Sequence, residues 1–184
     1  MQIHLIIAAV AAALGAAVLV MRADLRRLLS TIGPKWANLH PDVQTRALEV
    51  LAIANDHFRD QGLRVGIFDG WRPESDQTKH IESGVSFVSS ARRSYHVWGL
   101  AVDFVFIDAA GNWTWLPNPN NPADRGYRDS RWFELGAIIE GAGFEWGGRW
   151  SQFDGPHAQL PVRRTATLIA EHPGGFEQWQ SSWA

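Results

Sequence analysis

Two short stretches of this sequence carry side chains that commonly bind metal ions. The stretch Ser94–Asp103 places His96 and Asp103 seven residues apart, with a glycine between them. The second stretch, Asp154-Gly155-Pro156-His157, adds another imidazole and another carboxylate. Two imidazoles and one carboxylate suit zinc, and three protein ligands leave a fourth position for water, as in catalytic zinc sites. We therefore predict that His96, Asp103 and His157 bind one zinc ion.

The composition narrows the kinds of metal site that are possible. The chain of 184 residues has no cysteine, so thiolate zinc sites and a disulfide scaffold are both excluded. The remaining ligands would also accept manganese, cobalt or nickel. The alternative without a metal is a hydrogen-bonded His96 beside a core strand. Against this alternative, Asp103 in a buried strand would be a costly charge unless it were paired or bound to a metal.

A turn must bring the two ends of the first stretch together. If Ser94–Asp103 were fully extended, His96 and Asp103 would lie more than about 20 Å apart, too far for one metal ion. Gly99 lies between them, and we expect the turn at this residue. Residues 100–107 then have apolar side chains on both faces, which indicates a central, buried strand.

The rest of the sequence predicts an α+β domain over residues 23–184, in which helices pack on a small, mainly antiparallel sheet that carries a single zinc site. Helical spacing of apolar residues predicts helices over 41–61, 74–81, 130–142 and 161–171. Strand patterns cover 63–68, 100–107, 113–115, 144–148 and 157–160. The tail from Pro173 onward is expected to be irregular.

An apolar segment precedes this domain. Residues 5–21 contain no charged side chain and as a helix would reach about 25 Å, just short of a hydrocarbon core of about 30 Å. We expect an N-terminal apolar helix that acts as a signal-anchor over residues 1–22 and contacts the inner membrane through residues 3–21. The alternatives are the core of a cleaved signal peptide and a buried core helix. Basic residues follow the segment and none precedes it, so the positive-inside rule would place the domain in the cytoplasm.

Charge and tryptophan content bear on the partners of the protein. The net charge is −2 and no basic stripe is visible, so there is no reason to expect nucleic acid as a partner. Ten tryptophans are many for a chain of this size. We interpret them mainly as core residues and pocket walls, with sugar stacking as the alternative for one or two of them.

The spacing of the first motif resembles that of a known family. Ser94-x-His96-x-x-Gly99-x-Ala101-x-Asp103 resembles the first zinc motif of the LAS metallopeptidases, the M15 peptidase family. Residues 144–150 followed by 153–157 are similar to the endolysin branch, in which Trp-Gly-Gly precedes Asp-x-x-His. Gly70-Trp71-Arg72-Pro73-x-x-x-Gln77 resembles the upstream Arg and Gln of the family. The resemblance covers residues 39–160.

The resemblance and the side-chain chemistry together imply roles for further residues. Asp154 is expected to take a proton from the zinc-activated water and to pass it to the leaving amine, unless it only forms a turn. Arg72 is expected to stabilise the oxyanion or to bind a substrate carboxylate, unless it is a surface residue. Gln77 and Ser94 are expected to form hydrogen bonds with the peptide substrate. We interpret four other histidines as helix-face or surface residues: His40, His57, His80 and His172.

The family resemblance implies a function. It predicts a zinc-dependent peptidoglycan endopeptidase that hydrolyses the L-Ala–D-Glu bond of the murein stem peptide, a lytic enzyme of phage or prophage origin. The first alternative is a D-Ala-D-Ala carboxypeptidase or dipeptidase, in which Glu is typical at the position of Asp154. The second is a non-catalytic zinc-bearing module that binds the cell wall. We expect the protein to be a monomer. Because murein lies outside the inner membrane, we expect the domain to act in the periplasm, either anchored or released, although the positive-inside rule predicts the opposite orientation.

Overall fold

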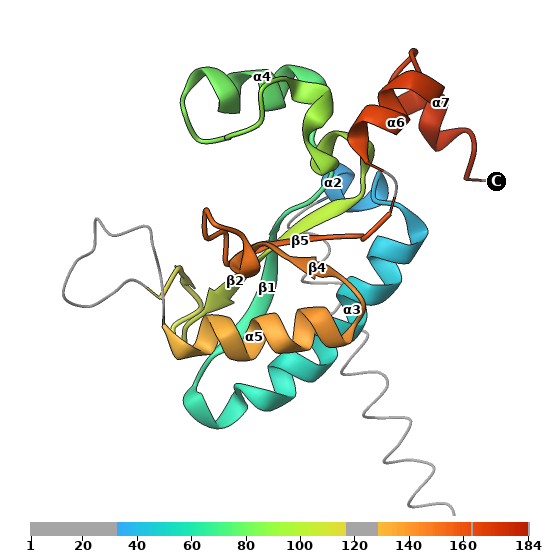
Figure 1. Ribbon diagram of the computed structural model, residues 1–184. Coiled ribbons are helices and arrows are strands. Elements are labelled where there is room, and N and C mark those ends of the chain that lie inside the picture. Colours follow the sequence, from blue (N-terminus) through green and yellow to red (C-terminus); the bar gives the residue numbers. More distant parts are fainter. Residues whose placement is uncertain (1–32, 117–128, 163, 184) are drawn as a thin grey trace, which may run out of the picture. The chain divides into compact units, whose positions relative to one another are not determined.

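The computed structural model describes residues 33–116, 129–162 and 164–183 (Figure 1). The predicted signal-anchor, residues 1–22, lies outside these ranges and stays a prediction. Within them, no helix is both long enough and apolar enough to cross a membrane. The second of two units of the chain, Pro34–Ala184, is compact and contains the sheet with its surrounding helices.

A five-stranded antiparallel sheet forms the centre of the second unit. Its strands are β1 (Arg64–Asp69), β2 (Ala101–Ile107), β3 (Trp113–Thr114), β4 (Glu145–Trp146) and β5 (His157–Gln159). They are ordered β1-β2-β5-β4, and β3 pairs with the C-terminal end of β2. Six of the seven residues of β2 are buried. The predicted small antiparallel sheet with a buried central strand is therefore confirmed.

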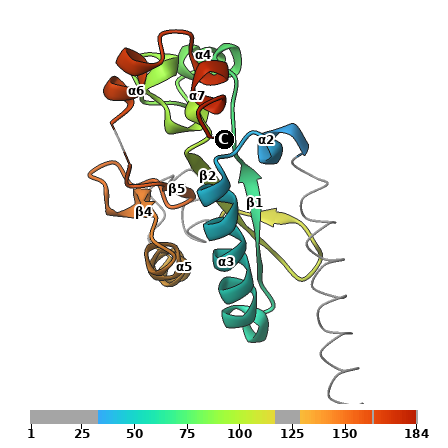
Figure 2. The same ribbon diagram turned by 90° about the vertical axis from the view of Figure 1, so that its right-hand side faces the viewer.

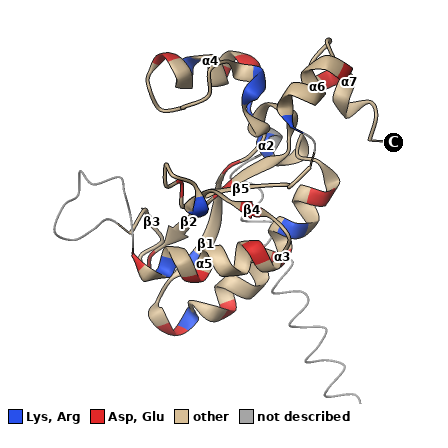
Figure 3. Ribbon diagram, viewed as in Figure 1, with Lys and Arg blue, Asp and Glu red and all other residues tan. Residues whose placement is uncertain are grey.

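The helices agree with the sequence pattern over most of the described ranges. They are α2 (Gly33–Ala37), α3 (Pro41–His57), α4 (Glu74–Glu82), α5 (Ser130–Gly141), α6 (Thr165–Glu171) and α7 (Phe176–Gln180), with short 3-10 helices η1 (Arg59–Gln61), η2 (Ala91–Arg93), η3 (Tyr95–Trp98) and η4 (Gly147–Arg149). The predicted helices over 41–61, 74–81 and 130–142 correspond to α3 with η1, α4 and α5. Along α3 and α5 both acidic and basic residues occur, so these helices carry no stripe of one sign (Figure 3).

The prediction for the C-terminal part is wrong in two respects. The last predicted helix begins at Thr165 rather than at 161, and the tail after Pro173 contains helix α7 instead of irregular chain. Phe176 of α7 is buried, and the indole N–H of Trp179 donates to the carbonyl of Trp98 at 3.0 Å. A helix this short is stabilised by such tertiary contacts rather than by local propensity, which is why the sequence pattern does not reveal it.

One face of the sheet packs on α3 and α5. Phe106 of β2 is fully buried there, and its ring meets Phe58, which follows α3, and Trp132 of α5 edge to face. The ring centroids lie 5.1 Å and 4.9 Å from that of Phe106. Figure 2 shows α3 running beside β1 and α5 seen end-on. The two helices thus cover the apolar face of the central strand.

The opposite face of the sheet carries the candidate site residues. Side chains alternate along a strand, so Asp103 points away from the face of Phe106. Asp103 pairs with His157 of β5 on one side and with Asp69 of β1 on the other. Directly paired residues project from the same face of a sheet. The register of three strands therefore gathers these three side chains on one surface.

Two glycines make room for Trp146, which packs β4 against α5. A Cβ atom added to Gly136 of α5 or to Gly148 would overlap the indole ring of Trp146. Trp146 is almost fully buried, and its indole N–H donates to the carbonyl of Gly155 at 2.7 Å. Gly155 belongs to the turn that leads into β5, so Trp146 helps to fix the position of that turn.

Candidate metal centre and active site

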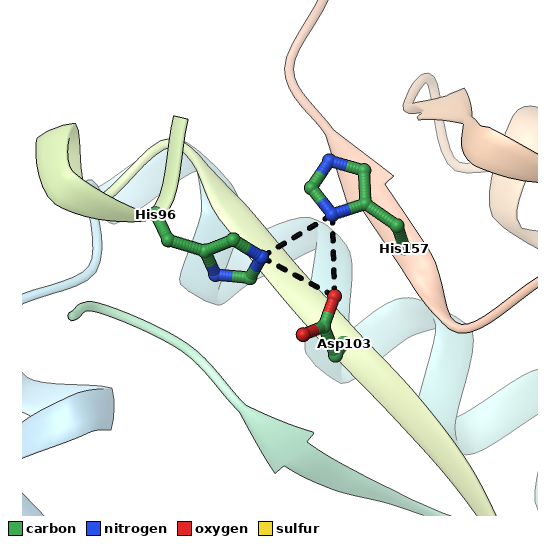
Figure 4. Close-up of side chains that lie close together, drawn as sticks. All are labelled: His96, Asp103 and His157. Carbon is green, nitrogen blue, oxygen red and sulfur yellow. Dashed lines mark hydrogen bonds and ion pairs between the residues drawn. The ribbon is translucent and has the colours of Figure 1, made fainter. Parts of the chain in front are cut away.

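The side chains of His96, Asp103 and His157 converge on one point (Figure 4). Nε2 of His96 lies 3.2 Å from Nδ1 of His157. Oδ1 of Asp103 lies 3.3 Å from the first of these atoms and 3.2 Å from the second. The three atoms form a nearly equilateral triangle. The three residues expected from the sequence to share a metal ion are thus close together in the structure.

The triangle has the dimensions that a small tetrahedral ion needs. At ligand distances of about 2.0–2.1 Å, the ligand atoms of tetrahedral zinc lie about 3.3 Å from one another. The observed separations are 3.2 Å and 3.3 Å. Both imidazoles are buried, with exposed fractions of 4% for His96 and 8% for His157. The residues present therefore fit a bound divalent metal ion.

The outer nitrogen of each imidazole is held by an oxygen acceptor. Nδ1 of His96 lies 2.8 Å from the carbonyl oxygen of Gly70, and Nε2 of His157 lies 3.1 Å from Oε1 of Gln159. These nitrogens act as donors, because their partners are oxygen acceptors. The lone pairs of His96 Nε2 and His157 Nδ1 are then left facing the centre of the triangle. Partners of this kind typically orient histidines that ligate metals.

The electrostatics of the triangle also favour a cation. Burial alone would raise the pKa of Asp103, but the neighbouring His96 and His157 lower it well below its ordinary value. For His157, burial alone would lower the pKa, whereas the hydrogen bond and the charge of Asp103 raise it. The lowered pKa favours the ionised form of this half-buried carboxylate. A divalent ion bound between the three side chains would offset the charge of Asp103 and would compete with protons for the imidazole nitrogens.

Gly99 makes the turn that the spacing of the first motif requires. It has φ of 68° and ends η3, the short helix that carries His96. A Cβ atom at this position would overlap the carbonyl oxygen of Asn38, and the carbonyl of Gly99 accepts from the N–H of His40 at 2.9 Å. Both the backbone angle and the close approach require glycine. The predicted turn between His96 and Asp103 is therefore confirmed.

Asp154 lies in the turn that leads into β5. Its carbonyl accepts from the N–H of His157 at 3.2 Å, and its N–H donates to the carbonyl of Gly147 at 3.1 Å. Burial and the charge of Asp103 raise the pKa of Asp154 above its ordinary value. Asp154 also lines the same pocket as the three candidate ligands. A half-buried carboxylate with a raised pKa in this place has the properties of a general base.

Arg72 is buried, which excludes the alternative of a surface residue. Oδ2 of Asp69 accepts from Nε at 3.2 Å and from Nη2 at 2.6 Å, and Oε1 of Gln77 accepts from Nη1 at 2.6 Å. A guanidinium has five N–H groups, so about two remain for other partners. Nη2 also lies 3.8 Å from Oδ2 of Asp103. Arg72 is therefore fixed beside the candidate metal centre and keeps donors available.

The structure places Gln77 and Ser94 differently. Gln77 is fully buried, and besides its contact with Arg72 its amide nitrogen donates to Oγ of Ser86 at 2.7 Å. These contacts make it a support for Arg72 and for the 83–90 loop. Ser94 is 7% exposed and lines the pocket next to His96. Substrate binding by these two residues stays a prediction.

A pocket of about 320 Å³ opens over the candidate metal centre. The pocket is lined by the three candidate metal ligands, by the proposed general base Asp154 and by Arg72. Its wall also includes residues from α4, the 83–90 loop, η2, the turn after η4 and the strands or their ends: His80, Val85, Phe87, Arg93, Trp150, Phe68, Trp115 and Gln159. Its volume is within the usual range of small-ligand sites.

Several contributors to this site were missed by reasoning from the sequence. Asp69 is 2% exposed, binds Arg72 and forms an ion pair with Lys35 at 2.7 Å. The sequence contains a hint of this role, because Asp69 is the last residue of a largely apolar strand and lies three residues before Arg72, close enough for an ion pair. Gln159, two residues after a predicted ligand, orients His157. Trp150 packs on the ring of His157 with centroids 5.1 Å apart.

The remaining histidines lie mostly as expected. His57 is exposed and its Nε2 lies 2.7 Å from Oε2 of Glu134. His40 caps α3 by accepting from the N–H of Asp42 at 3.2 Å, and His172 follows α6. His80 lies on α4 as expected, but it also lines the pocket.

Comparison with known proteins adds an independent line of observation. Residues 88–160, which contain both candidate ligand motifs, match a family of M15 peptidases described as D-alanyl-D-alanine carboxypeptidase. The chain is 33% identical over 138 residues to the peptidoglycan L-alanyl-D-glutamate endopeptidase CwlK of Bacillus subtilis (strain 168), covering 69% of this chain and 76% of the relative. It is 36% identical over 114 residues to the L-alanyl-D-glutamate peptidase of Listeria phage A118, covering 61% of this chain but 36% of the phage protein.

The fold also has a counterpart among solved structures. It is similar to the crystal structure of the Serratia marcescens L-Ala D-Glu endopeptidase ChiX, with a TM-score of 0.52. The sequence identity is 23%, and the match covers 76% of this chain and 87% of the other. At this identity the likeness concerns the fold alone.

Proposed function

This chain belongs to the M15 family of peptidases, and we propose that it is a metal-dependent peptidoglycan endopeptidase that hydrolyses the L-Ala–D-Glu bond of the stem peptide. The observation that carries the proposal is the convergence of His96, Asp103 and His157 in one pocket with Asp154 and Arg72. The names of the two relatives at 33% and 36% identity support the choice of bond.

We propose zinc as the metal, held by His96 Nε2, Asp103 Oδ1 and His157 Nδ1. A divalent ion in this position supplies Lewis-acid polarisation of the scissile carbonyl and acidifies the attacking water. The fit to tetrahedral dimensions and the mixture of two imidazoles with one carboxylate support zinc. Gly70 and Gln159 keep the two rings turned so that the ligating lone pairs face inward.

Asp154 is the general base and then the general acid in this proposal. Its carboxylate takes a proton from the water that attacks the carbonyl carbon of L-Ala, and it later gives that proton to the amine of D-Glu as the C–N bond breaks. Its raised pKa brings it closer to the pKa that a proton carrier needs at neutral pH. The turn held by Gly147 fixes its distance from His157.

Arg72 stabilises the negative charge that develops on the carbonyl oxygen. The Asp69 carboxylate and the Gln77 amide occupy one side of its guanidinium, and its remaining N–H groups are free to donate to that oxygen. Because the arginine is held in advance, little reorganisation is needed when the charge develops. Ser94, at the pocket wall, is proposed to bind the peptide backbone of the substrate.

Digestion of purified murein tests the bond that is cut. Treatment with the wild-type protein is expected to leave glycan strands whose lactyl groups carry only L-Ala and to release peptides that begin with D-Glu, as read by mass spectrometry. A chelator should abolish the release, and zinc should restore it. The matched control is Asp154→Ala, which should bind zinc normally and release nothing. Release of peptides that begin with any other residue would contradict the proposal.

A D-Ala-D-Ala carboxypeptidase is the second candidate function, because that is the description of the family matched by residues 88–160. The same digest separates the two, since a carboxypeptidase would remove terminal D-Ala and leave the stem peptide attached to the glycan. Asp154, where that branch typically has Glu, favours the endopeptidase. A third possibility, a cell-wall-binding module without turnover, predicts that neither product is formed.

We further propose that the enzyme acts in the periplasm during phage lysis, held at the inner membrane by residues 1–22 or released from it. The apolar run in residues 5–21 and the position of murein outside the inner membrane support this location. Fractionation before and after collapse of the membrane potential tests release. A protein found in the membrane pellet under both conditions is anchored rather than released, and one found in the cytosol would contradict the location.

A further inference from the structure

Exposed apolar side chains are concentrated around the pocket. Among the described residues, eight large apolar side chains are exposed, and four of them line this one pocket: Phe68, Val85, Phe87 and Trp150. A fifth, Trp113, is 52% exposed and meets the ring of Phe68 edge to face, with centroids 5.3 Å apart. Apolar surface that gathers at a site in this way usually contacts a ligand.

Three of the aromatic residues form a contiguous group, which we call the aromatic wall: Phe68, Trp113 and Trp115. The ring of Phe68 is nearly perpendicular to both indoles, at 82° to Trp113 and 81° to Trp115. Phe68 and Trp115 line the pocket, and Trp113 extends the group beyond its edge. The wall therefore continues from the pocket onto the outer surface.

Two residues of the aromatic wall lie in strands of the sheet, and Trp115 directly follows β3. Phe68 is in β1 and Trp113 is in β3, whose partner in the ladder is Ile107 of β2. The carbonyl of Trp115 accepts from the indole N–H of the buried Trp132 at 3.2 Å. Binding surfaces on rigid elements lose little conformational entropy when a ligand binds.

The register of the sheet places the wall directly beside the candidate metal centre. Ile67 pairs with Phe104 and Asp69 pairs with Asp103, so Phe68 is the extra residue of a β-bulge next to Asp103. Bulges re-aim a side chain, and they are frequent next to active sites. Neighbouring strands lie about 4.8 Å apart, so the backbone at Phe68 is about one strand spacing from the backbone at Asp103.

In the substrate of the proposed function, a sugar lies close to the bond that is cleaved. L-Ala is joined through its amine to the lactyl group of N-acetylmuramic acid, so one residue and one lactyl unit separate the bond from the glycan. Two such units span about 7 Å when extended. The peptide near the bond offers a methyl group and carboxylates, whereas pyranose rings offer flat faces of C–H groups. Those faces pack on the electron-rich faces of aromatic rings.

We propose that the aromatic wall binds the glycan strand of peptidoglycan, so that the enzyme acts preferentially on stem peptides still attached to N-acetylmuramic acid. This inference rests on the proposed function. Phe68 and Trp115 contact the muramic acid at the pocket edge, and Trp113 contacts the next sugar outward.

Paired substrates test the proposal. One is the free stem tripeptide L-Ala-D-Glu-diaminopimelate, and the other is the same peptide attached to the disaccharide of N-acetylglucosamine and N-acetylmuramic acid. We expect kcat/KM of the wild-type protein to be about tenfold higher for the disaccharide substrate, as for stacking of one or two rings. Trp113→Leu should reduce this preference several-fold by removing the contact with the outer sugar, whereas Trp113→Phe, which keeps an aromatic face, should retain it. Ile53→Ala, an exposed apolar residue of α3, is the matched control and should change neither rate.

The outcomes separate this proposal from the proposed function. Equal kcat/KM values for the two substrates, or a preference that Trp113→Leu leaves intact, would overturn the sugar-binding wall while the endopeptidase stands. If neither substrate is cut at the L-Ala–D-Glu bond, the proposed function is wrong, and the sugar-binding proposal that rests on it is wrong as well. Binding to phosphatidylglycerol vesicles that Trp113→Leu abolishes, with an unchanged substrate preference, would show that the wall contacts a membrane and would equally overturn the proposal.

Discussion

Asp69 holds the guanidinium of Arg72 with a single carboxylate oxygen, which accepts from Nε at 3.2 Å and from Nη2 at 2.6 Å. The other oxygen binds Lys35 and the N–H of Gly70. The carbonyl of that same Gly70 orients His96. The buried Asp69 therefore contacts both the proposed oxyanion-binding residue, Arg72, and Gly70, whose carbonyl orients the proposed metal ligand His96.

Replacing this carboxylate should impair catalysis without removing the metal. Asp69→Asn keeps the size of the side chain but weakens its hold on Arg72, so we expect kcat/KM to fall by about 10- to 100-fold, as for a misplaced catalytic group. The zinc content should remain close to one ion per chain, because the three ligands are intact. Steady-state kinetics on a stem-peptide substrate and metal analysis of the same preparation check both statements. Arg59→Gln, which removes an exposed ion pair on the other side of the sheet, is the control.

The same aspartate should contribute to the acid sensitivity of the fold. Burial alone would raise the pKa of Asp69, but His96, Arg72 and Lys35 lower it below its ordinary value. A carboxyl whose pKa is lowered by folding stabilises the protein fully above its unfolded pKa of about 3.9, and this contribution is lost as the pH falls through the folded pKa. The stability difference between wild type and Asp69→Asn should therefore shrink below about pH 4. Urea unfolding of the metal-free proteins between pH 3 and pH 6 measures it, and a difference that is constant with pH would contradict the assignment.

Removing the proposed proton carrier should abolish turnover selectively. In Asp154→Asn the side chain can no longer accept a proton, and we expect kcat to fall by about 10²- to 10⁴-fold. The carboxylate is not one of the three ligand atoms, so zinc affinity should change little. Measurement of kcat, combined with a zinc titration in competition with a chromogenic chelator, distinguishes loss of the general base from loss of the metal. Normal turnover by this variant would exclude Asp154 as the base.

Metal removal should destabilise the domain as well as inactivate it. An ion would bind the folded chain through Asp103 and both imidazoles, whereas the unfolded chain does not hold these three groups together. An ion present at about 1,000 times its Kd stabilises the folded state by about 4 kcal/mol. Thermal unfolding with zinc, and after dialysis against a chelator, should therefore differ by several degrees in Tm. His96→Ala should unfold at the same temperature under both conditions.

A substitution far from the pocket tests the packing that supports it. Gly136→Ala places a methyl group against the ring of Trp146, and we expect a loss of about 1–3 kcal/mol in the free energy of unfolding, as for an overpacked core. Gly141→Ala lies in the same helix with no atom near its new Cβ, so it should be neutral or stabilising by up to about 1 kcal/mol. Chemical denaturation compares the two. Equal effects would show that Trp146 yields to the added methyl group.

The sequence alone predicted the centre of the site more completely than its surroundings. His96, Asp103 and His157 could be selected because metal chemistry restricts residue type, and the turn at Gly99 followed from the length of the chain between two of them. The support for Arg72 could not be deduced in the same way. It depends on the pairing of Asp69 with Asp103 across a bulge, and local patterns do not specify strand register on their own.

The fold shows the same division. The helices and strands with clear apolar periodicity, such as α3 and β2, lie where the sequence predicts them. Helix α7 depends on contacts with η3, and the fit of Trp146 between Gly136 and Gly148 depends on residues from three elements. Such long-range contacts have no signature in a window of neighbouring residues.

The pairing of Asp103 with His157 has a consequence for how the enzyme matures. These two proposed ligands are 54 positions apart in the sequence and meet only when β5 pairs with β2. A nascent chain that has not closed this ladder offers an incomplete donor set and binds the ion weakly. The proposed site can therefore take up its ion only after β5 pairs with β2, so we expect no peptidase activity before that pairing has formed.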